Sequence, residues 1–400
     1  MGGGRVKFLL GKDMGFTCFK SGIKPGTSPV RFSLALSFCL SLSTVYYLLP
    51  TASFAGDAAG GAVMSFLRMD PAAHQTGMGG VGVGLFENLQ NMSYNPALLG
   101  MLKHNEIVFS HTNWLVDSRF QDVALAFATR SRGTFGVRYK TLSYGAIDSY
   151  DAEGGKLASF KARDSLISAS WGGQIERAHG ICAGITIRQA TQDLSFVSAG
   201  AVMADAGFSM LPFKERLNGA FSFGLAVKNL GPEITFDREK EALPSTLDFG
   251  FGWKGLLERF SAGLDIHLPK TQGMYYSAGA QYRAADMLDL RAGFENRQEQ
   301  GSGLRLGAGV NFGAWQLDYA WLPFGLLGDT HHASLLYRFG GPAESAYEAG
   351  IKAMRKARYA EAVLNFATAL EEDPSMDKAA LKLKAAHKLL QEQKALKEAP

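Results

Sequence analysis

Between about residues 106 and 341, apolar and polar side chains alternate with a period of two. In the segment 288–295 (LDLRAGFE), every second residue from Leu288 to Phe294 is apolar, and the residues between them are polar or glycine. Four further segments repeat the pattern: 134–141, 260–268, 304–312 and 315–321. Successive side chains of a strand point to opposite faces, so each segment is predicted to be a strand with one apolar face and one polar or small face.

The length and number of these segments favour strands that cross a membrane. Tilted strands of about ten residues span a bilayer, and about fourteen such segments occur, an even number within the range of bacterial barrels. The apolar faces end in aromatic side chains, which prefer the membrane interface: Trp253, Tyr276, Tyr282, Trp315, Trp321, Tyr337 and Phe339. The pattern predicts an all-β transmembrane barrel of about fourteen antiparallel strands in outer-membrane lipid. A soluble exported β protein is the alternative.

An export signal is predicted at the N-terminus, over residues 1–55. Arg31 opens an uncharged apolar stretch, which ends in Ser53-Phe54-Ala55 with small residues at the positions that a signal peptidase reads. A membrane-anchoring helix over Phe32 to Leu49 is the alternative, because that stretch is long enough to span. The start of translation is Met1 or Met14.

Charge and cysteine content narrow the class of protein. The formal net charge of +4 arises in the predicted signal, where six basic residues face one acidic residue, and the remainder is nearly neutral. No basic stripe of the kind that nucleic acids require is present. Cys18 and Cys39 lie in the predicted signal, so Cys182 has no internal disulfide partner and is expected to be a small buried residue.

The polar face of the predicted strands mixes both signs of charge with glycine and alanine. Opposite charges in a confined lumen can pair, and glycines let other backbone come close. A one-sign ladder of the kind that an ion-selective pore uses is not seen. We therefore expect a plugged or narrow lumen, lined by these polar residues: Arg138, Asp265, Asp289, Arg291, Arg305 and Asp318.

A glycine-rich segment, residues 56–105, precedes the first predicted strand. Its GMGGVG stretch includes Gly77, Gly79 and Gly80, but it lacks the strand–loop–helix setting of a dinucleotide site and the lysine of a phosphate loop. No cofactor is therefore expected. A tightly folded plug or hatch with a turn at Asn95-Pro96, tucked into the barrel mouth, is the interpretation that we favour.

Several short stretches together resemble the PorV/PorQ-type outer-membrane proteins, which are related in form to FadL-type channels for hydrophobic compounds. The matching stretches are Asp70-Pro71, Gly77-Met78-Gly79, Gly82-Val83, Asn95-Pro96-Ala97, 227–232, Leu243-Pro244, 290–294 and 317–340. The resemblance implies a fourteen-stranded barrel without catalytic residues. It also implies either a role attached to type IX protein secretion or a transport role.

After residue 341 the period becomes helical. Residues 342–400 are predicted to form a periplasmic helical module, in which 346–374 resembles one tetratricopeptide repeat (TPR). The residues at the characteristic positions of that repeat are Gly350, Ala362, Phe366, Ala369 and Pro374. One repeat cannot bury its apolar face alone. The module is therefore either a helical cap or a docking site for a secreted or periplasmic protein.

No catalytic or metal-binding motif is found, and no enzyme is predicted. His331 and His332 are neighbours in a predicted strand, so their rings face opposite sides and cannot share a metal ion. Phe339 ends the last predicted strand, where barrel-assembly machinery usually reads an aromatic residue. Two functions remain open: a secretion-associated or surface-assembly component that uses the helical tail, and a FadL-like channel for a hydrophobic ligand.

Overall fold

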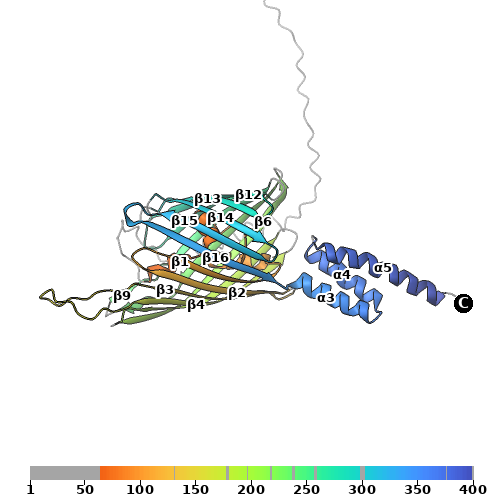
Figure 1. Ribbon diagram of the computed structural model, residues 1–400, viewed down its shortest axis with the longest axis horizontal. Helices are drawn as coiled ribbons and strands as arrows, with labels where there is room; N and C mark the ends of the chain where they lie inside the picture. The colour runs from red at the N-terminus through yellow and green to blue at the C-terminus, as the bar shows by residue number, and fades with distance from the viewer. Residues whose placement is uncertain are drawn as a thin grey trace, which may run out of the picture. The chain divides into compact units, whose positions relative to one another are not determined.

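The computed structural model describes residues 64–398 except 130, 177–179, 196, 217–218, 237–238, 256–258, 298–301 and 375. The predicted signal peptide lies outside these residues. Within them, fourteen antiparallel strands close into a barrel (Figure 1). The strands, in barrel order from β1, are β1 (Asn105–Asn113), β2 (Arg119–Thr129), β3 (Gly133–Ser143), β4 (Arg163–Glu176), β5 (Ile181–Asp193), β6 (Ser198–Arg216), β7 (Gly219–Leu230), β10 (Thr246–Gly255), β11 (Phe260–Pro269), β12 (Tyr275–Ala285), β13 (Leu288–Glu295), β14 (Leu304–Phe312), β15 (Trp315–Pro323) and β16 (Asp329–Phe339).

The barrel closes by pairing its first strand with its last. β1 and β16 run antiparallel, in a register that joins Asn105 to Phe339 and Asn113 to His331. Closure leaves no unpaired strand edge, which a barrel in lipid requires. The predicted fold class, an all-β barrel of fourteen strands, is confirmed.

Alternation of side chains divides the barrel wall into two surfaces. In β13, Leu288, Leu290 and Phe294 are exposed on the outside, while Asp289 and Arg291 are buried. Other strands repeat this pattern with outward valine, isoleucine and tyrosine, such as Val137, which is 52% exposed. An apolar outer surface around polar residues is the arrangement of an outer-membrane barrel. No helix in the described part of the chain is long and apolar enough to cross a membrane.

The two ends of the barrel carry connections of different length. At the end that we call the long-loop end, residues 144–162 join β3 to β4, and residues 231–245 join β7 to β10 and contain the small hairpin of β8 (Ile234–Phe236) and β9 (Glu239–Glu241). At the short-turn end, only residues 286–287 join β12 to β13. In bacterial barrels, short turns face the periplasm and longer loops face outward.

The chain before β1 lies inside the barrel and is called the plug here (residues 64–104; the orange segment in Figure 1). It consists of four short helical pieces joined by irregular chain: η1 (Ser65–Arg68), α2 (Ala73–Gly77), η2 (Leu89–Ser93) and η3 (Pro96–Met101). Most of its residues are buried. A further short helical turn, η5 (Gly325–Leu327), lies between β15 and β16.

Three helices follow the barrel: α3 (Pro342–Arg355), α4 (Tyr359–Glu372) and α5 (Asp377–Glu398). They have cores of their own, in which Phe366 of α4 packs with Ala353 of α3 and Ala386 of α5. The expected helical module is therefore present as a helix–turn–helix with a third helix. Gly350 lies against the Phe366 ring, Ala362 and Ala369 are fully buried, and Pro374 stands in the turn before α5.

Candidate functional site

A belt of glycines on the inner wall receives the plug. Nine neighbouring strands, from β4 to β14, each supply at least one: Gly172, Gly184, Gly207, Gly224, Gly250, Gly252, Gly263, Gly279, Gly293 and Gly307. Several are direct partners across the sheet, such as Gly172 with Gly184 and Gly279 with Gly293. A Cβ at these positions would overlap the plug or force it to shift. We call this set the glycine belt.

The belt brings backbone against backbone. Gly279 and Gly293 leave room for the main chain of Met78 and Gly79, and Gly224 leaves room for the carbonyl group of Val83. Such contacts are possible only where the wall has no side chain. At these positions, the main chain of the plug packs directly against the main chain of the wall, with no wall side chain between them.

Buried polar groups fix the plug in this seat. The Asp265 carboxylate of β11 accepts hydrogen bonds from the main-chain N–H groups of Gly82 and Val83, at 2.7 and 2.9 Å. Inside the plug, the Asn91 amide donates to the carbonyl groups of Gly82 and Leu85. The plug therefore satisfies main-chain groups that would otherwise be buried without partners.

The predicted plug residues all lie at this seat. Gly77 packs against Gly307, Gly79 lies between the main chains of β12 and β13 with a φ of 77°, and Gly80 lies beside Glu295 and Arg305. The expected turn at Asn95-Pro96 is the start of η3: the Asn95 side chain accepts from the N–H of Ala97, and Pro96 takes the first helical position. This segment lies against Gly184 of the wall, near the start of β5.

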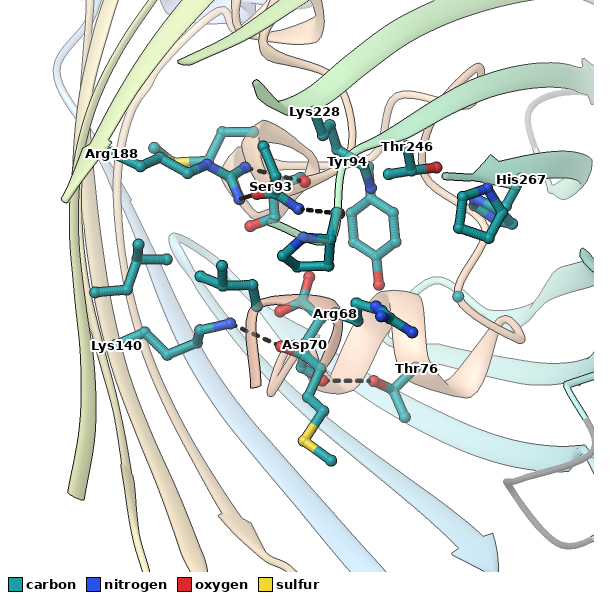
Figure 2. Close-up of a pocket in the computed structure, with 18 of the residues that line it drawn as sticks. Arg68, Asp70, Thr76, Ser93, Tyr94, Lys140, Arg188, Lys228, Thr246 and His267 are labelled. Carbon is teal, nitrogen blue, oxygen red and sulfur yellow. Dashed lines mark hydrogen bonds between the residues drawn. The ribbon is translucent and has the colours of Figure 1, made fainter. Parts of the chain in front are cut away.

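A chamber lies in the part of the barrel nearer the long-loop end, and the start of the plug borders it on that side: Leu67 packs with Phe120 and Leu243, and Arg68 donates to Thr271 of the loop between β11 and β12. It is a cavity of about 100 Å³, with a floor formed by Thr76, Gly80, Ser93 and Tyr94 of the plug. Its walls include Thr246 and Tyr275, the first residues of β10 and β12, both of which begin at the long-loop end. Figure 2 shows the wall side chains Lys140, Arg188 and Lys228 around Asp70 and Tyr94 of the plug.

Most of the charged side chains that line this chamber are basic. Seven basic side chains line it, against the two acidic side chains of Asp70 and Glu295. The seven are Arg68, Arg138, Lys140, Arg188, Lys228, Arg297 and Arg305. Three further carboxylates, those of Asp122, Asp205 and Asp248, lie behind the lining and pair with Arg138, Arg188 and Lys228. The lining therefore presents an excess of positive charge to the cavity.

Two of these cations also hold the plug. Arg138 Nη2 lies 2.8 Å from the Asp70 carboxylate, and Lys140 Nζ donates to the carbonyl groups of Phe66 and Met69 at 3.2 and 2.8 Å. Burial pushes the pKa of Asp70 upward, but the adjacent Arg138 and Lys140 outweigh it, so the pKa lies below its ordinary value. Asp70 is therefore an anion held by the chamber cations.

A second polar network lies on the α2 side of the plug. His74 of α2 is buried beside Gln316 and Asp318 of β15, with His74 Nδ1 at 3.3 Å from Gln316 Nε2. Arg291 donates to Asp318 at 2.8 Å. Burial first, and the nearby Arg291 second, hold the pKa of His74 well below its usual range. His74 is therefore neutral in the seated plug.

The six predicted lumen residues all lie inside the barrel, but not at one site. Arg138 and Arg305 line the chamber. Asp265 anchors the plug, and the other three, Asp289, Arg291 and Asp318, belong to the network beside α2. Opposite charges pair inside the lumen, between side chains of nearby strands.

Some residues of the site were not singled out from the sequence. Arg188 and Tyr94 became part of it only when the topology placed them around one cavity. Glycines at inward positions of successive strands were the available signal for the belt. Among the described residues, no group of three or more histidine, cysteine, aspartate or glutamate side chains is placed to hold a metal ion.

Comparison with known proteins gives distant structural likeness. No family model matches the chain, and no curated protein matches its sequence. The chain is similar to the crystal structure of the P. putida toluene transporter TodX (12% identity, 66% of this chain and 97% of that chain, TM-score 0.46). It is also similar to the Ralstonia pickettii toluene transporter TbuX (12%, 67% and 98%, TM-score 0.44) and to a Pseudomonas aeruginosa FadL homologue (11%, 67% and 98%, TM-score 0.39). These likenesses are too distant to bear on function, and the resemblances to PorV/PorQ and to a TPR stay predictions.

Proposed function

We propose that this chain is a non-catalytic outer-membrane protein that passes small molecules inward, with the chamber beside the plug as the solute-binding site. One observation carries the proposal. The barrel holds a solute-sized chamber towards its long-loop end, and the floor of that chamber is a seated plug. A protein that only anchored a partner would need neither feature.

In this proposal, the plug makes the passage selective, because a solute has to displace it in order to cross. The plug meets the glycine belt over nine strands, so a solute that crosses the barrel has to pass the plug. Short helical pieces joined by irregular chain have few internal hydrogen bonds and unfold locally more readily than a barrel strand. A solute bound in the chamber can therefore shift the plug only if it binds the displaced state better than the seated state.

Flux into proteoliposomes tests this proposal. The full-length protein is reconstituted, and a panel of labelled acids, sugars and hydrocarbons is offered from outside. We expect at least one class to cross faster than into protein-free vesicles. If every class crosses at the protein-free rate, the passage function is wrong.

A secretion-associated or surface-assembly role is the second candidate, with a periplasmic docking tail. The helices favour it: they have their own cores, yet Leu364 and Leu381 are 67% and 68% exposed. In this case, a strain whose chain stops after residue 341 would lose specific surface proteins while solute flux stays normal. Unchanged surface proteins in that strain would contradict the role.

A further inference from the structure

The chamber has the chemistry of an anion site. Its lining carries seven basic side chains and two acidic ones, and the carboxylates that balance Arg138, Arg188 and Lys228 are set back behind the cavity surface. An anion in the cavity would therefore contact the basic side chains and not these three carboxylates. The hydroxyl group of Ser93 adds a neutral donor to the same lining.

Two buried polar atoms of this lining point to a ligand. Arg188 Nε and Ser93 Oγ have no hydrogen-bond partner among the described residues. The Arg188 residue is only 6% exposed, so its free N–H is costly unless something binds it. The rest of the Arg188 guanidinium is already fixed by Asp205, Asn229 and the carbonyl group of Ser93. A pre-oriented guanidinium donor suits an oxyanion.

The chamber already binds one carboxylate in this way. Asp70 belongs to the plug, and its carboxylate lies on Arg138. Lys140, beside it, is held by two main-chain carbonyl groups of the plug, and no carboxylate of the described residues lies within ion-pair distance of its Nζ. An external anion would therefore compete for the same cations that hold the start of the plug.

We propose that the chamber binds a compact, multiply charged oxyanion, a phosphate or phosphorylated solute, and that this anion competes with Asp70 for Arg138 and with the main-chain carbonyl groups of the plug for Lys140. The inference rests on the proposed passage function and names its substrate class. The excess of basic groups favours a dianion over a monocarboxylate. Displacement of Asp70 would loosen the plug at its first turn.

Equilibrium dialysis of the purified full-length protein with labelled inorganic phosphate tests this site. We expect saturable binding that weakens as salt is raised. Unlabelled glucose 6-phosphate should displace the phosphate, while glucose, decanoate and toluene should not. Displacement by decanoate or toluene, or a failure of phosphate to bind, would overturn the proposal. Displacement by lipopolysaccharide would also overturn it, because the phosphate would then come from a lipid.

Substitutions in the chamber test whether phosphate binds at these basic side chains. Lys140→Met should weaken phosphate binding at least about tenfold, because a charge-assisted hydrogen bond is lost. The pair Arg188→Gln with Asp205→Asn removes a second cation together with its carboxylate and leaves no unpaired buried charge. Lys254→Met is the matched control, since Lys254 pairs with Glu87 of the plug but does not line the chamber. Native affinity in both chamber variants would contradict the site.

The two proposals fail separately. If phosphate binds but no solute crosses in proteoliposomes, the anion site stands and the passage function is wrong. If a solute crosses but phosphate does not bind in the chamber, the passage function stands and the substrate class is wrong.

Discussion

Asn95 of the plug donates a hydrogen bond of 2.9 Å from its Nδ2 to the main-chain carbonyl group of Phe208 in β6. The same amide donates to the carbonyl group of Val83, and its Oδ1 caps η3 by accepting from the N–H of Ala97. One side chain thus joins two parts of the plug to the wall. Asn95→Ala should destabilise the seated plug by about 2–4 kcal/mol, because three buried hydrogen bonds are lost.

The measurement for Asn95→Ala is limited proteolysis of the plug in the folded barrel, together with thermal unfolding. We expect faster cleavage within residues 64–104 and an intact barrel. Equal cleavage rates in native and variant protein would show that Asn95 does not hold the plug.

The glycine belt predicts a sharp contrast within one strand. Gly207→Val in β6 should unseat the plug, at a cost of about 3 kcal/mol or more, because a side chain there would overlap Asn95 and Pro96. Gly200→Val in the same strand is the control, since only the carbonyl group of Ala190 lies near its Cβ position, at 3.7 Å. Planar-bilayer conductance should rise for Gly207→Val alone. A rise of the same size in both variants would argue against a belt.

A reversible lock tests whether the plug must move. A Cβ at Gly77 would lie 3.6 Å from Cβ of Ala320 in β15, within the range of about 3.5–4.5 Å that a disulfide needs. The double variant Gly77→Cys, Ala320→Cys should form a bond that ties α2 to the wall. We expect solute flux to stop after oxidation and to return after reduction. Undiminished flux in the oxidised protein would mean that solute bypasses the plug.

The plug should seat less firmly in acid because of His74. Its pKa lies well below the ordinary value of 6.5 when the plug is seated, owing to burial and the nearby Arg291, Lys254, Arg338 and Arg283. A displaced plug would expose the imidazole and take up a proton, so seating is unaffected above pH 6.5 and weakens below it. The change approaches about 1.4 kcal/mol per pH unit.

Conductance measured between pH 7.5 and 5 checks the effect of His74. Native protein should leak increasingly below pH 6.5, and His74→Gln, which cannot titrate, should leak at a level independent of pH. The same pH dependence in His74→Gln would assign the effect to another group.

The aromatic end of β16 carries a prediction about assembly. The Phe339 ring is stacked on Tyr337 and meets Phe127 edge-on. If barrel-assembly machinery reads Phe339, then Phe339→Ala should lower the outer-membrane yield several-fold, while Tyr337→Phe keeps both rings and the native yield. The fraction of heat-modifiable protein in outer-membrane preparations measures this. A native yield for Phe339→Ala would leave Phe339 with a packing role alone.

The barrel could be predicted from the sequence because the alternation that defines each strand is visible within a few consecutive residues. In a strand such as 288–295, apolar and polar side chains alternate and so mark its two faces. About fourteen segments of this kind indicate a sheet that closes into a barrel. The pairing of charges in the lumen also followed from mixed signs on the inner face.

The chamber could not be predicted in the same way, because it depends on which strands become neighbours of the plug. Arg188 in β5 and Lys228 in β7 look like ordinary inward cations in the sequence. Only the folded topology sets them around one cavity, with Asp205 and Asp248 behind them. The path of the plug depends likewise on contacts such as Asn95 with Phe208, between residues 113 positions apart.

The glycine belt makes the substitutions that the wall can tolerate depend on the presence of the plug. A barrel that lost residues 64–104 would no longer need bare backbone at Gly184, Gly279 or Gly293, and side chains would be free to return there. A relative in which valine or threonine replaces these glycines could not seat a plug along this path. The inner-face glycines of a related gene therefore indicate whether its barrel has room for a plug of this kind.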